Sequence, residues 1–312
     1  MLISVVIPCY NVENCIQEGL LSVYNQTYSK LEVICVDNNS TDSTLDRLKY
    51  LKSSFYPNLI ILSETNRGAP FARNRGLYNA KGEWIQFLDA DDIIEKNKIS
   101  QQVSLIQRNN NIGYIVSGCK YRDVNGNDTI DDLLSNDKFT SAFIRQSGNT
   151  CSNLWKKSHL LAIGGWNVKL QSSQETDLMF RLILNGSEYL IDRNINTIVR
   201  ARKDGQISQS APGPRWGRFI EVRLGYLKHL KIQNPEVYYT NRDIYYNYLL
   251  WALIILLRYD KVLASMYFTI IKKEKWKALN LYGLSKKRVN FIKVFGLRSY
   301  GIYMRIKDHI TK

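Results

Sequence analysis

Apolar runs and amphipathic stretches alternate along the first hundred residues. The run ISVVIP (3–8) is almost wholly apolar, which predicts a buried strand. Further strands are predicted at 31–37, 59–63 and 83–89, with amphipathic helices between them at 13–24, 42–51 and 70–80. Strands that alternate with helices of about ten residues predict a mostly parallel sheet with helices on both faces.

The pattern is less regular further along the chain. We expect a helix at 99–108, a strand at 112–122 before a turn at 125–128, and a clear helix at 174–184. The segment APGPRWG (211–217) holds two prolines and two glycines, so it is expected to break regular structure and mark a boundary. The predicted organisation is an α/β domain over 1–212 followed by a helical extension over 213–312.

The charge is concentrated in the last third of the chain. The 312 residues carry a formal net charge of +15. Residues 213–312 hold 20 Lys or Arg and 6 Asp or Glu, a net charge of +14, which leaves +1 for residues 1–212. Any partner selected by positive charge must therefore bind the C-terminal third. The 45% of hydrophobic residues indicates a sizeable core rather than disorder.

Cysteine usage and the N-terminus indicate the compartment. Five cysteines without a C-x-x-C pair favour a reducing environment and argue against a disulfide framework or a zinc site. The N-terminal MLISVVIPCYN lacks the charged start and the apolar length of a signal peptide. We therefore expect a cytoplasmic protein.

Polar residues follow all four predicted strands. In an open α/β sheet, ligands bind beyond the carboxyl ends of the strands. The residues found there are Pro8, Tyr10, Asn11, Glu13, Asp37, Glu64, Asn66, Arg67, Gly68 and the DADD motif at 89–92. Carboxylates gathered at one edge of a sheet indicate a metal ion and a polar ligand.

The DADD motif has the clearest chemistry. Asp89 and Asp91, separated by Ala90, can present oxygens to one hard cation such as Mg²⁺ or Mn²⁺ and to a sugar or ribose hydroxyl. The structural alternative is that Asp92 caps a helix that begins at Ile93. The position of the motif directly after an apolar strand favours the metal site.

Three other residues are candidates for nucleotide contacts. Asp37 can accept the N–H of a base, and Tyr10 can lie against a flat base; an Asx-turn and simple packing are the alternatives. In NRGAPFARNRG (66–76) a glycine loop enters a helix at Pro70, so Arg73 can face a diphosphate.

Three segments together resemble family 2 of the glycosyltransferases. They are SVVIPCYNVENCIQEGLLSVYNQTY, EVICVDNNSTDST and NRGAPFARNRGLYNAKGEWIQFLDADD, which match the family in order and spacing over residues 3–95. A looser match follows at 164–184. The resemblance implies a Rossmann-like GT-A fold, a nucleoside-diphosphate sugar donor, a divalent cation (Mn²⁺ or Mg²⁺) and inversion at the anomeric carbon. Uridine is the expected base, with guanosine and thymidine left open.

The resemblance also implies roles for individual residues. Those assigned to the donor are Pro8, Tyr10, Asn11, Glu13, Asp37, Asn66, Gly68, Arg73, Asp89 and Ala90. Asp89 matches the acid that faces ribose and sugar, and Asp91 the acid that binds the cation. Glu175 falls where the family usually has an aspartate base. The chain departs from the family at three places. It has DNNS where the family commonly has DDGS, and Gln174-Glu175 where the family usually has an acidic pair. It also lacks the histidine that the family often has in the region matching 200–208.

Two acids near the start of the helix at 174–184 compete for the role of base. Glu175 and Asp177 lie roughly 200° apart around the helix, so they cannot both face the cleft. The apolar stripe of this helix consists of Leu178, Met179, Leu182 and Ile183. Glu175 lies near its centre and is predicted to point inward, whereas Asp177 is expected to pair with Arg181. The alternative is that Glu175 only caps the helix.

The C-terminal third is basic and rich in tyrosine. Its most apolar window, 244–257, has 14 residues, short of the roughly 20 needed to span a bilayer. Basic runs at 272–277 and 285–288, mixed with aromatics, suit an anionic membrane surface. The alternative is a helical subdomain with an aromatic core and solvated lysines.

The resemblance, together with the acidic strand ends, implies an inverting glycosyltransferase. It would move a sugar from a UDP-sugar to a hydroxyl of a glycan or lipid-linked acceptor, in surface polysaccharide synthesis at the inner face of the cell membrane. One alternative is a homologue that binds the donor without turnover, against which the complete DADD and Glu175 argue. The other is a nucleic-acid-binding protein, which leaves the acidic strand ends unexplained, so no nucleic acid partner is expected.

Overall fold

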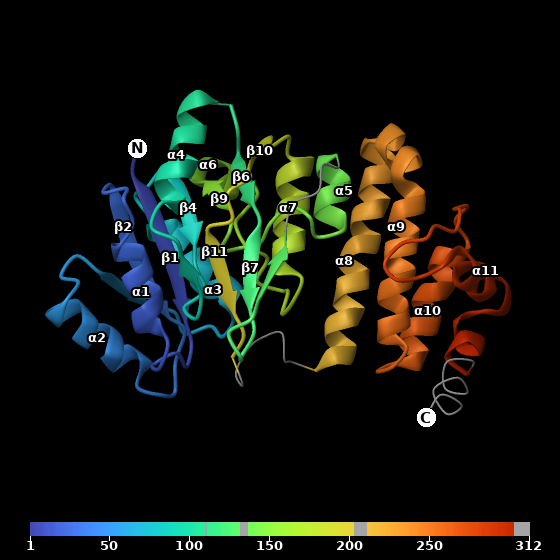
Figure 1. Cartoon of the computed structure of the whole chain (residues 1–312), viewed down its shortest axis with the longest axis horizontal. Helices are drawn as coiled ribbons and strands as arrows, with labels where there is room; N and C mark the ends of the chain where they lie inside the picture. Colours follow the sequence, from blue (N-terminus) through green and yellow to red (C-terminus); the bar gives the residue numbers. More distant parts are fainter. Residues whose placement is uncertain (110, 132–136, 203–210, 303–312) are drawn as a thin grey trace. The chain divides into compact units, whose positions relative to one another are not determined.

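The computed structural model describes residues 1–109, 111–131, 137–202 and 211–302 (Figure 1). Contacts divide the chain into two compact units, Met1–Gln206 and Ile207–Lys312. The α/β fold with helices after it is confirmed. The assignment of 1–212 and 213–312 as separate domains stays a prediction.

A seven-stranded sheet forms the centre of the first unit. Its spatial order is β10-β6-β9-β4-β1-β2-β3. In this order the strands are Tyr189–Asp192, Tyr114–Ser117, Leu154–Lys156, Trp84–Phe87, Ile3–Cys9, Leu31–Asp37 and Ile60–Ser63. Neighbours pair in parallel, except that β9 is antiparallel to both β4 and β6. The mostly parallel sheet predicted from the alternating pattern is therefore confirmed.

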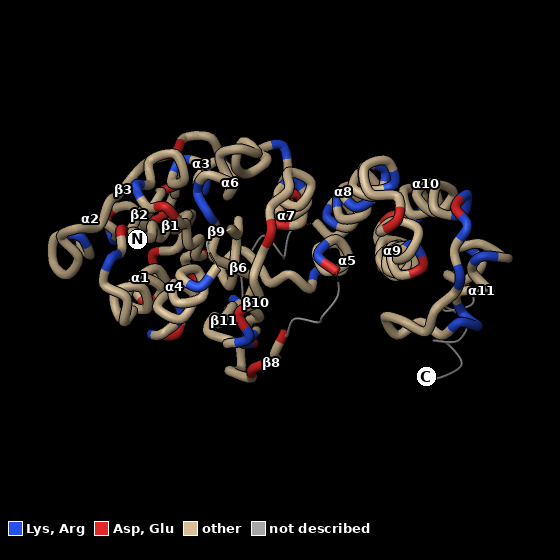
Figure 2. Tube along the Cα trace, turned by 90° about the horizontal axis from the view of Figure 1, so that it is seen from above, with Lys and Arg blue, Asp and Glu red and all other residues tan. Residues whose placement is uncertain are grey.

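Helices cover both faces of this sheet. The helices of the first unit are α1 (Ile16–Tyr24), α2 (Thr44–Ser54), α3 (Ala69–Asn79), α4 (Lys98–Arg108), α5 (Lys138–Phe143), α6 (Lys157–Ala162) and α7 (Gln174–Leu184). Figure 2 shows α3 and α6 on one side of the strands, and α1 and α4 on the other. Side chains alternate along β1, so Val5 and Ile7 join the core beneath α1 while Val6 faces α3.

A second, four-stranded sheet corrects one expectation. Its order is β5-β11-β7-β8, formed by Ile93–Ile94, Thr197–Arg200, Cys119–Arg122 and Asp128–Asp131. The strand expected at 112–122 is in fact two strands, β6 and β7, which belong to different sheets. At Ser117 the backbone N–H is donated to Asn153 Oδ1 (3.0 Å), and the Ser117 hydroxyl to the carbonyl of Asn194 (2.7 Å). These long-range bonds end β6, and no local pattern indicates them.

The second unit is helical. It contains α8 (Pro212–Gln233), α9 (Pro235–Leu256), α10 (Lys261–Lys272) and α11 (Lys286–Phe295). The expected break at 211–217 is wrong for all but its first residue, because Pro212 begins α8 and the helix continues through Gly217. Prolines fit the first turn of a helix, where the backbone N–H groups have no intrahelical acceptor.

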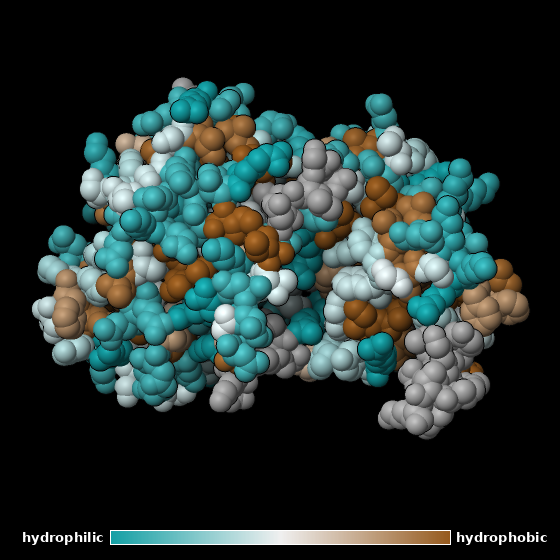
Figure 3. All heavy atoms as spheres, viewed as in Figure 1, coloured by the Kyte–Doolittle hydropathy of each residue, from teal (hydrophilic) through white to brown (hydrophobic). Residues whose placement is uncertain are grey.

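The aromatic side chains of the second unit form much of its core. Tyr238, Tyr245, Tyr246, Tyr248 and Trp276 are buried. Trp251 stacks on Tyr248 with ring centroids 5.2 Å apart. The apolar window at 244–257 is thus used for packing within the helical unit. Figure 3 shows hydrophobic residues in small groups among hydrophilic ones on the visible face. In the described part of the chain, no helix has the length and apolarity needed to cross a bilayer.

One close helix–strand contact in the first unit depends on a glycine. A Cβ atom at Gly76 of α3 would lie 2.2 Å from Val6 Cγ1, far inside van der Waals contact. Because Val6 is held in the centre of the sheet, α3 can pack this closely only if residue 76 has no side chain.

We predict that Gly76→Ala destabilises the protein by about 1–3 kcal/mol through overpacking. Gly225→Ala is the matched control, since Gly225 is an exposed position of α8 where an added Cβ would meet no atom within 4 Å. That substitution should leave stability unchanged or raise it by about 0.5–1 kcal/mol. Thermal and denaturant unfolding measure both changes. Equal stabilities for the two variants would contradict the tight contact.

Candidate active site

The carboxyl ends of the first four strands lie at one edge of the sheet. Residue pairing aligns Cys9 with Asp37 and Asp37 with Ser63, while β4 lies on the other side of β1. The chain therefore passes from β3 back across β1 to β4. The point where the strand order reverses is where open α/β sheets bind ligands. The predicted gathering of polar loops is confirmed at this edge.

Asp37 has an unsatisfied carboxylate oxygen. Its side chain is only 6% exposed, and Oδ1 is buried without a hydrogen-bond partner among the described residues. Leaving such an acceptor unpaired costs about 1–3 kcal/mol, which a ligand N–H could recover. Tyr10 is 41% exposed, and the Arg67 guanidinium donates to its hydroxyl and lies 5.1 Å from its ring centroid. Pro8 precedes them as the penultimate residue of β1.

Asn11 and Glu13 are occupied by contacts within the protein. Asn11 Oδ1 accepts the backbone N–H of Thr41 (2.9 Å), and Glu13 Oε2 accepts that of Ser43 (2.8 Å). Asn11 adopts φ +51°, a left-handed conformation that asparagine tolerates. Both side chains thus tie the loop after β1 to the loop after β2. Their predicted contact with the donor stays a prediction.

Asn38 is a site residue that sequence reasoning missed. Its amide donates to the carbonyls of Asn66 (2.6 Å) and Glu64 (3.1 Å) and accepts the N–H of Gly68 (2.7 Å). These bonds hold the loop after β3, where Gly68 has φ +134°. The signal was the DNNS sequence, in which an amide replaces the second acid of the family pattern.

Arg73 joins three parts of the site. Its Nη2 lies 2.7 Å from Asp89 Oδ1, and its Nη1 donates to Gln174 Oε1 at 3.0 Å. The guanidinium also lies 4.7 Å from the Trp166 ring centroid. Arg73 is buried, whereas the Asp89 side chain is 37% exposed. Instead of lying open to a diphosphate, Arg73 holds Asp89 and connects it to the start of α7.

Asp91 is paired with an arginine from the segment after β11. Arg202 Nε lies 2.8 Å from Asp91 Oδ2, and Arg200 Nε donates to the Asp91 backbone carbonyl at 2.5 Å. The pair is largely shielded, with 14% of the Asp91 and 26% of the Arg202 side chain exposed. This places arginines in the segment where the family often has a histidine. Residues 203–208 of that segment lie outside the described residues.

Asp92 is not a helix cap, because strand β5 follows it. Its Oδ1 accepts the backbone N–H of Arg200 (2.9 Å), which joins the motif to β11. Burial, with Asp89 and Asp91 nearby, raises the pKa of Asp92 well above its usual range. The alternative of a helix cap is therefore excluded, and a long-range backbone partner takes up the carboxylate.

Asp92 also belongs to a cluster with Asp89 and Cys151, whose ligand atoms lie within 4.8 Å of one another. Cys151 Sγ accepts the backbone N–H of Asp89 (3.2 Å), and burial raises the pKa of this thiol well above its usual range. A neutral thiol is a poor ligand for Mg²⁺ or Mn²⁺, which prefer ionised oxygen donors. The cluster therefore helps to hold the DADD motif in place. A hard cation fits better at the carboxylates of Asp89 and Asp91.

Glu175 points inward from the first turn of α7. Its carboxylate accepts the backbone N–H (2.8 Å) and the hydroxyl (3.0 Å) of Thr150. Burial raises the pKa of Glu175, and Arg145 and the two Thr150 donors oppose that shift. Both hydrogen bonds come from another segment, which disfavours a role as a cap of its own helix.

Asp177 lies on the other side of α7 and pairs with Arg181 at 2.7 Å, as predicted. Arg181 also donates to the carbonyls of Ile163 and Gly165. The pair is half-buried rather than solvent-exposed, and it fixes the turn before α7. The Asp177 carboxylate therefore serves to hold Arg181, while Glu175 faces the interior near Arg73.

A mostly parallel α/β domain with a carboxylate oxygen that is buried and unpaired among the described residues, and with the sequence Asp-Ala-Asp at the same sheet edge, is typical of nucleotide-sugar-dependent transferases. The chain belongs to glycosyl transferase family 2, whose sequence model matches residues 4–161. It is thus a glycosyltransferase with a GT-A-like fold, as its resemblance implied.

Two curated relatives illustrate the range of similarity. An uncharacterized glycosyltransferase of Haemophilus influenzae is 28% identical over 282 residues, 88% of this chain and 91% of that protein. The Escherichia coli UDP-Glc:alpha-D-GlcNAc-diphosphoundecaprenol beta-1,3-glucosyltransferase WfgD is 34% identical over 151 residues, 48% of this chain and 58% of that protein.

Two solved structures share the fold. Residues 1–349 of Staphylococcus aureus TarS, in complex with UDP-GlcNAc, match with a TM-score of 0.62 and 20% identity over 84% of this chain and 74% of that one. The Pyrobaculum calidifontis mannosyltransferase PcManGT, in complex with GDP-Man and Mn²⁺, matches with a TM-score of 0.58 and 18% identity over 96% of this chain and 86% of that one.

Proposed function

We propose that the protein transfers a sugar, with inversion, from a UDP-sugar to a hydroxyl of a glycan or lipid-linked acceptor in surface polysaccharide synthesis. The observation that carries the proposal is the buried, unpaired oxygen of Asp37 at the same sheet edge as Asp89 and Asp91. The lipid-linked acceptor in the name of the E. coli relative and the UDP-GlcNAc bound to TarS support it.

Donor binding follows from the shape and charge of this edge. Asp37 Oδ1 accepts the N–H of the uracil, and the exposed ring of Tyr10 offers a flat face beside it. Asp89, held by Arg73, accepts hydroxyls of the ribose and sugar. Asn38 and Gly68 keep the loop after β3 in place for the donor.

A divalent cation, when bound, neutralises the charge that builds on the departing diphosphate. Asp91 and Asp89 would hold it, and the Mn²⁺ of the mannosyltransferase supports this role. Arg202 already neutralises Asp91, so cation binding competes with the Asp91–Arg202 pair.

Glu175 is the proposed base. It takes the proton of the acceptor hydroxyl as that oxygen attacks the anomeric carbon, and its two Thr150 bonds hold the carboxylate in one orientation. Such a base contributes about 10²–10⁴-fold to the rate.

The basic second unit attaches the enzyme to the inner, cytoplasmic face of the cell membrane. Its net charge of +14 from residue 213 onward supports binding to anionic lipids.

We predict that Arg202→Gln tightens Mn²⁺ binding by about tenfold, because the Asp91 carboxylate loses the positive charge that competes with the cation. Asp91→Asn should abolish Mn²⁺ binding and keep the fold. Titration of free Mn²⁺ by electron paramagnetic resonance measures both without turnover. Arg181→Gln is the control, since it removes an arginine paired with another acid of the same unit. Unchanged Mn²⁺ affinity in Asp91→Asn would rule out this metal site.

We predict that Glu175→Gln cuts transfer by at least about a hundredfold and leaves donor affinity nearly intact. Asp177→Asn, on the same helix, should keep most activity because Asp177 only pairs with Arg181. Single-turnover rates and donor titrations separate the two effects.

The pH dependence of the rate gives a second test of Glu175. A base with a raised pKa is protonated, and hence inactive, below that pKa, so the wild-type rate should fall as pH drops through a value above the usual glutamate range. The residual rate of Glu175→Gln should not show this fall at low pH. Inactivation by Asp177→Asn alone would mean that the wrong acid was chosen.

A further inference from the structure

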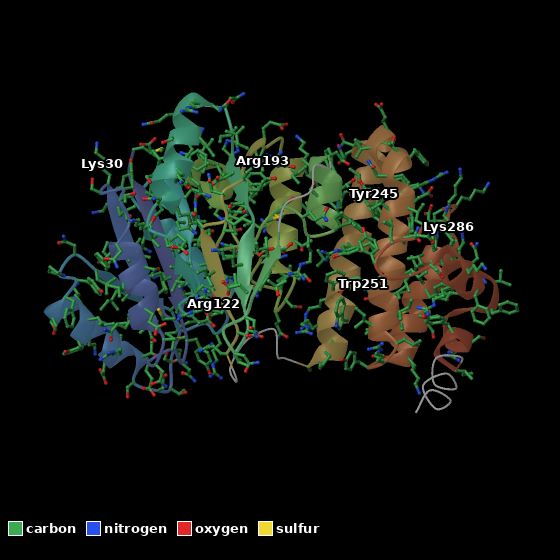
Figure 4. The ribbon with its side chains drawn as sticks, in the orientation of Figure 1. Lys30, Arg122, Arg193, Tyr245, Trp251 and Lys286 are labelled. Atoms are coloured by element: carbon green, nitrogen blue, oxygen red, sulfur yellow. The ribbon has the colours of Figure 1, made fainter. Side chains whose placement is uncertain are left out.

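The second unit contains a cavity of about 920 Å³, which lies near the upper end of the range for ligand pockets. Its floor is aliphatic and aromatic, formed by Trp251, Ile254 and Ile255 of α9, with Leu284 and Tyr300 from the later segments. Trp251 is labelled on α9 in Figure 4. A volume of this size with an apolar lining suits a hydrocarbon chain.

Four cations border the same cavity: Arg258, Lys261, Arg288 and Arg298. Within the described ranges none of them forms an ion pair, and Arg298 donates only to the neutral hydroxyl of Ser265 (3.2 Å). The acid adjacent to Lys261, Asp260, accepts the backbone N–H of Leu263 as the cap of α10. Among the described residues, these four positive charges have no carboxylate partner. We therefore expect a molecule bound in this apolar cavity to carry an anionic group.

We propose that this cavity binds an anionic phospholipid of the membrane. The acyl chain lies against the apolar floor, and the phosphate lies among the four cations. The inference rests on the membrane attachment proposed above and gives it a defined site in place of a diffuse basic surface.

The lining favours a lipid over the other phosphate-bearing partners. A free phosphate would leave the apolar floor without a role. A nucleic acid would need exposed aromatic faces for its bases, whereas Trp251 is already stacked on Tyr248 and Ile254, Ile255 and Leu284 are aliphatic.

The first test measures contact between a lipid chain and the cavity. The full chain is mixed with phosphatidylcholine vesicles, with or without phosphatidylglycerol that carries brominated acyl chains, which quench tryptophan on contact. We expect quenching only with phosphatidylglycerol, and Trp251→Phe should remove most of it while changing vesicle affinity less than about twofold. Quenching that is unaffected by Trp251→Phe would overturn the proposal.

The second test compares two charge-matched double variants. Arg258→Gln with Arg288→Gln removes two cations of the cavity, and Lys272→Gln with Lys273→Gln removes two exposed cations outside it, at the C-terminal end of α10. A diffuse basic surface loses about fivefold in affinity per cation wherever the cation lies. We expect the cavity pair to lose at least about tenfold more affinity than the control pair. Both pairs should melt within about 2 °C of the wild type, as surface substitutions do.

The outcomes separate this proposal from the general attachment. Equal losses in the two pairs would overturn the cavity and leave membrane attachment standing, whereas a wild type that ignores phosphatidylglycerol vesicles would overturn both. Inorganic phosphate at constant ionic strength should not displace the vesicles, and displacement would identify a phosphate site instead. An oligonucleotide whose binding is lost in the cavity pair would identify a nucleic acid as the occupant.

Discussion

The buried guanidinium of Arg73 connects the parts of the active site. It bonds Asp89 at the end of β4 and Gln174 at the start of α7, and it lies against Trp166. Burying an arginine is costly unless its donors are paired, and Arg73 Nε has no partner among the described residues, so the partners of its two Nη atoms must stay in place for the fold to be stable. The donor-side acid and the helix that carries the proposed base are thereby fixed relative to each other.

Arginines balance the acids of this domain in pairs. Arg73 holds Asp89, Arg202 holds Asp91, and Arg181 holds Asp177, which agrees with a net charge near zero over residues 1–212. Asp37 and Glu175, the acids proposed to contact the uracil and the acceptor hydroxyl, differ from these three. Asp37 keeps a buried oxygen unpaired among the described residues, and Glu175 is held by the neutral donors of Thr150.

In the second unit, packing and charge have separate roles. Its tyrosines and tryptophans, which in sequence suggested a membrane surface, mostly form the core between helices. Arg223 is buried in that core with its guanidinium over the Phe219 ring, but the other described cations are exposed or only partly buried, and four of them border the apolar cavity. The aromatic composition that suggested a lipid partner is thus explained largely by packing, and the proposal for lipid binding rests on the basic charge and the cavity instead.

The sequence by itself determined the early strands, α7 and the inward side of Glu175, because periodicity and helix geometry are local properties. It also identified the family, since the motifs follow the strand ends in a characteristic order. Only the tertiary structure decided that 112–122 is divided at Ser117, that Asp92 bonds the backbone of Arg200, and that Arg202 reaches Asp91. Each of these depends on a partner far away in the chain, and side-chain contacts across such distances leave no local pattern.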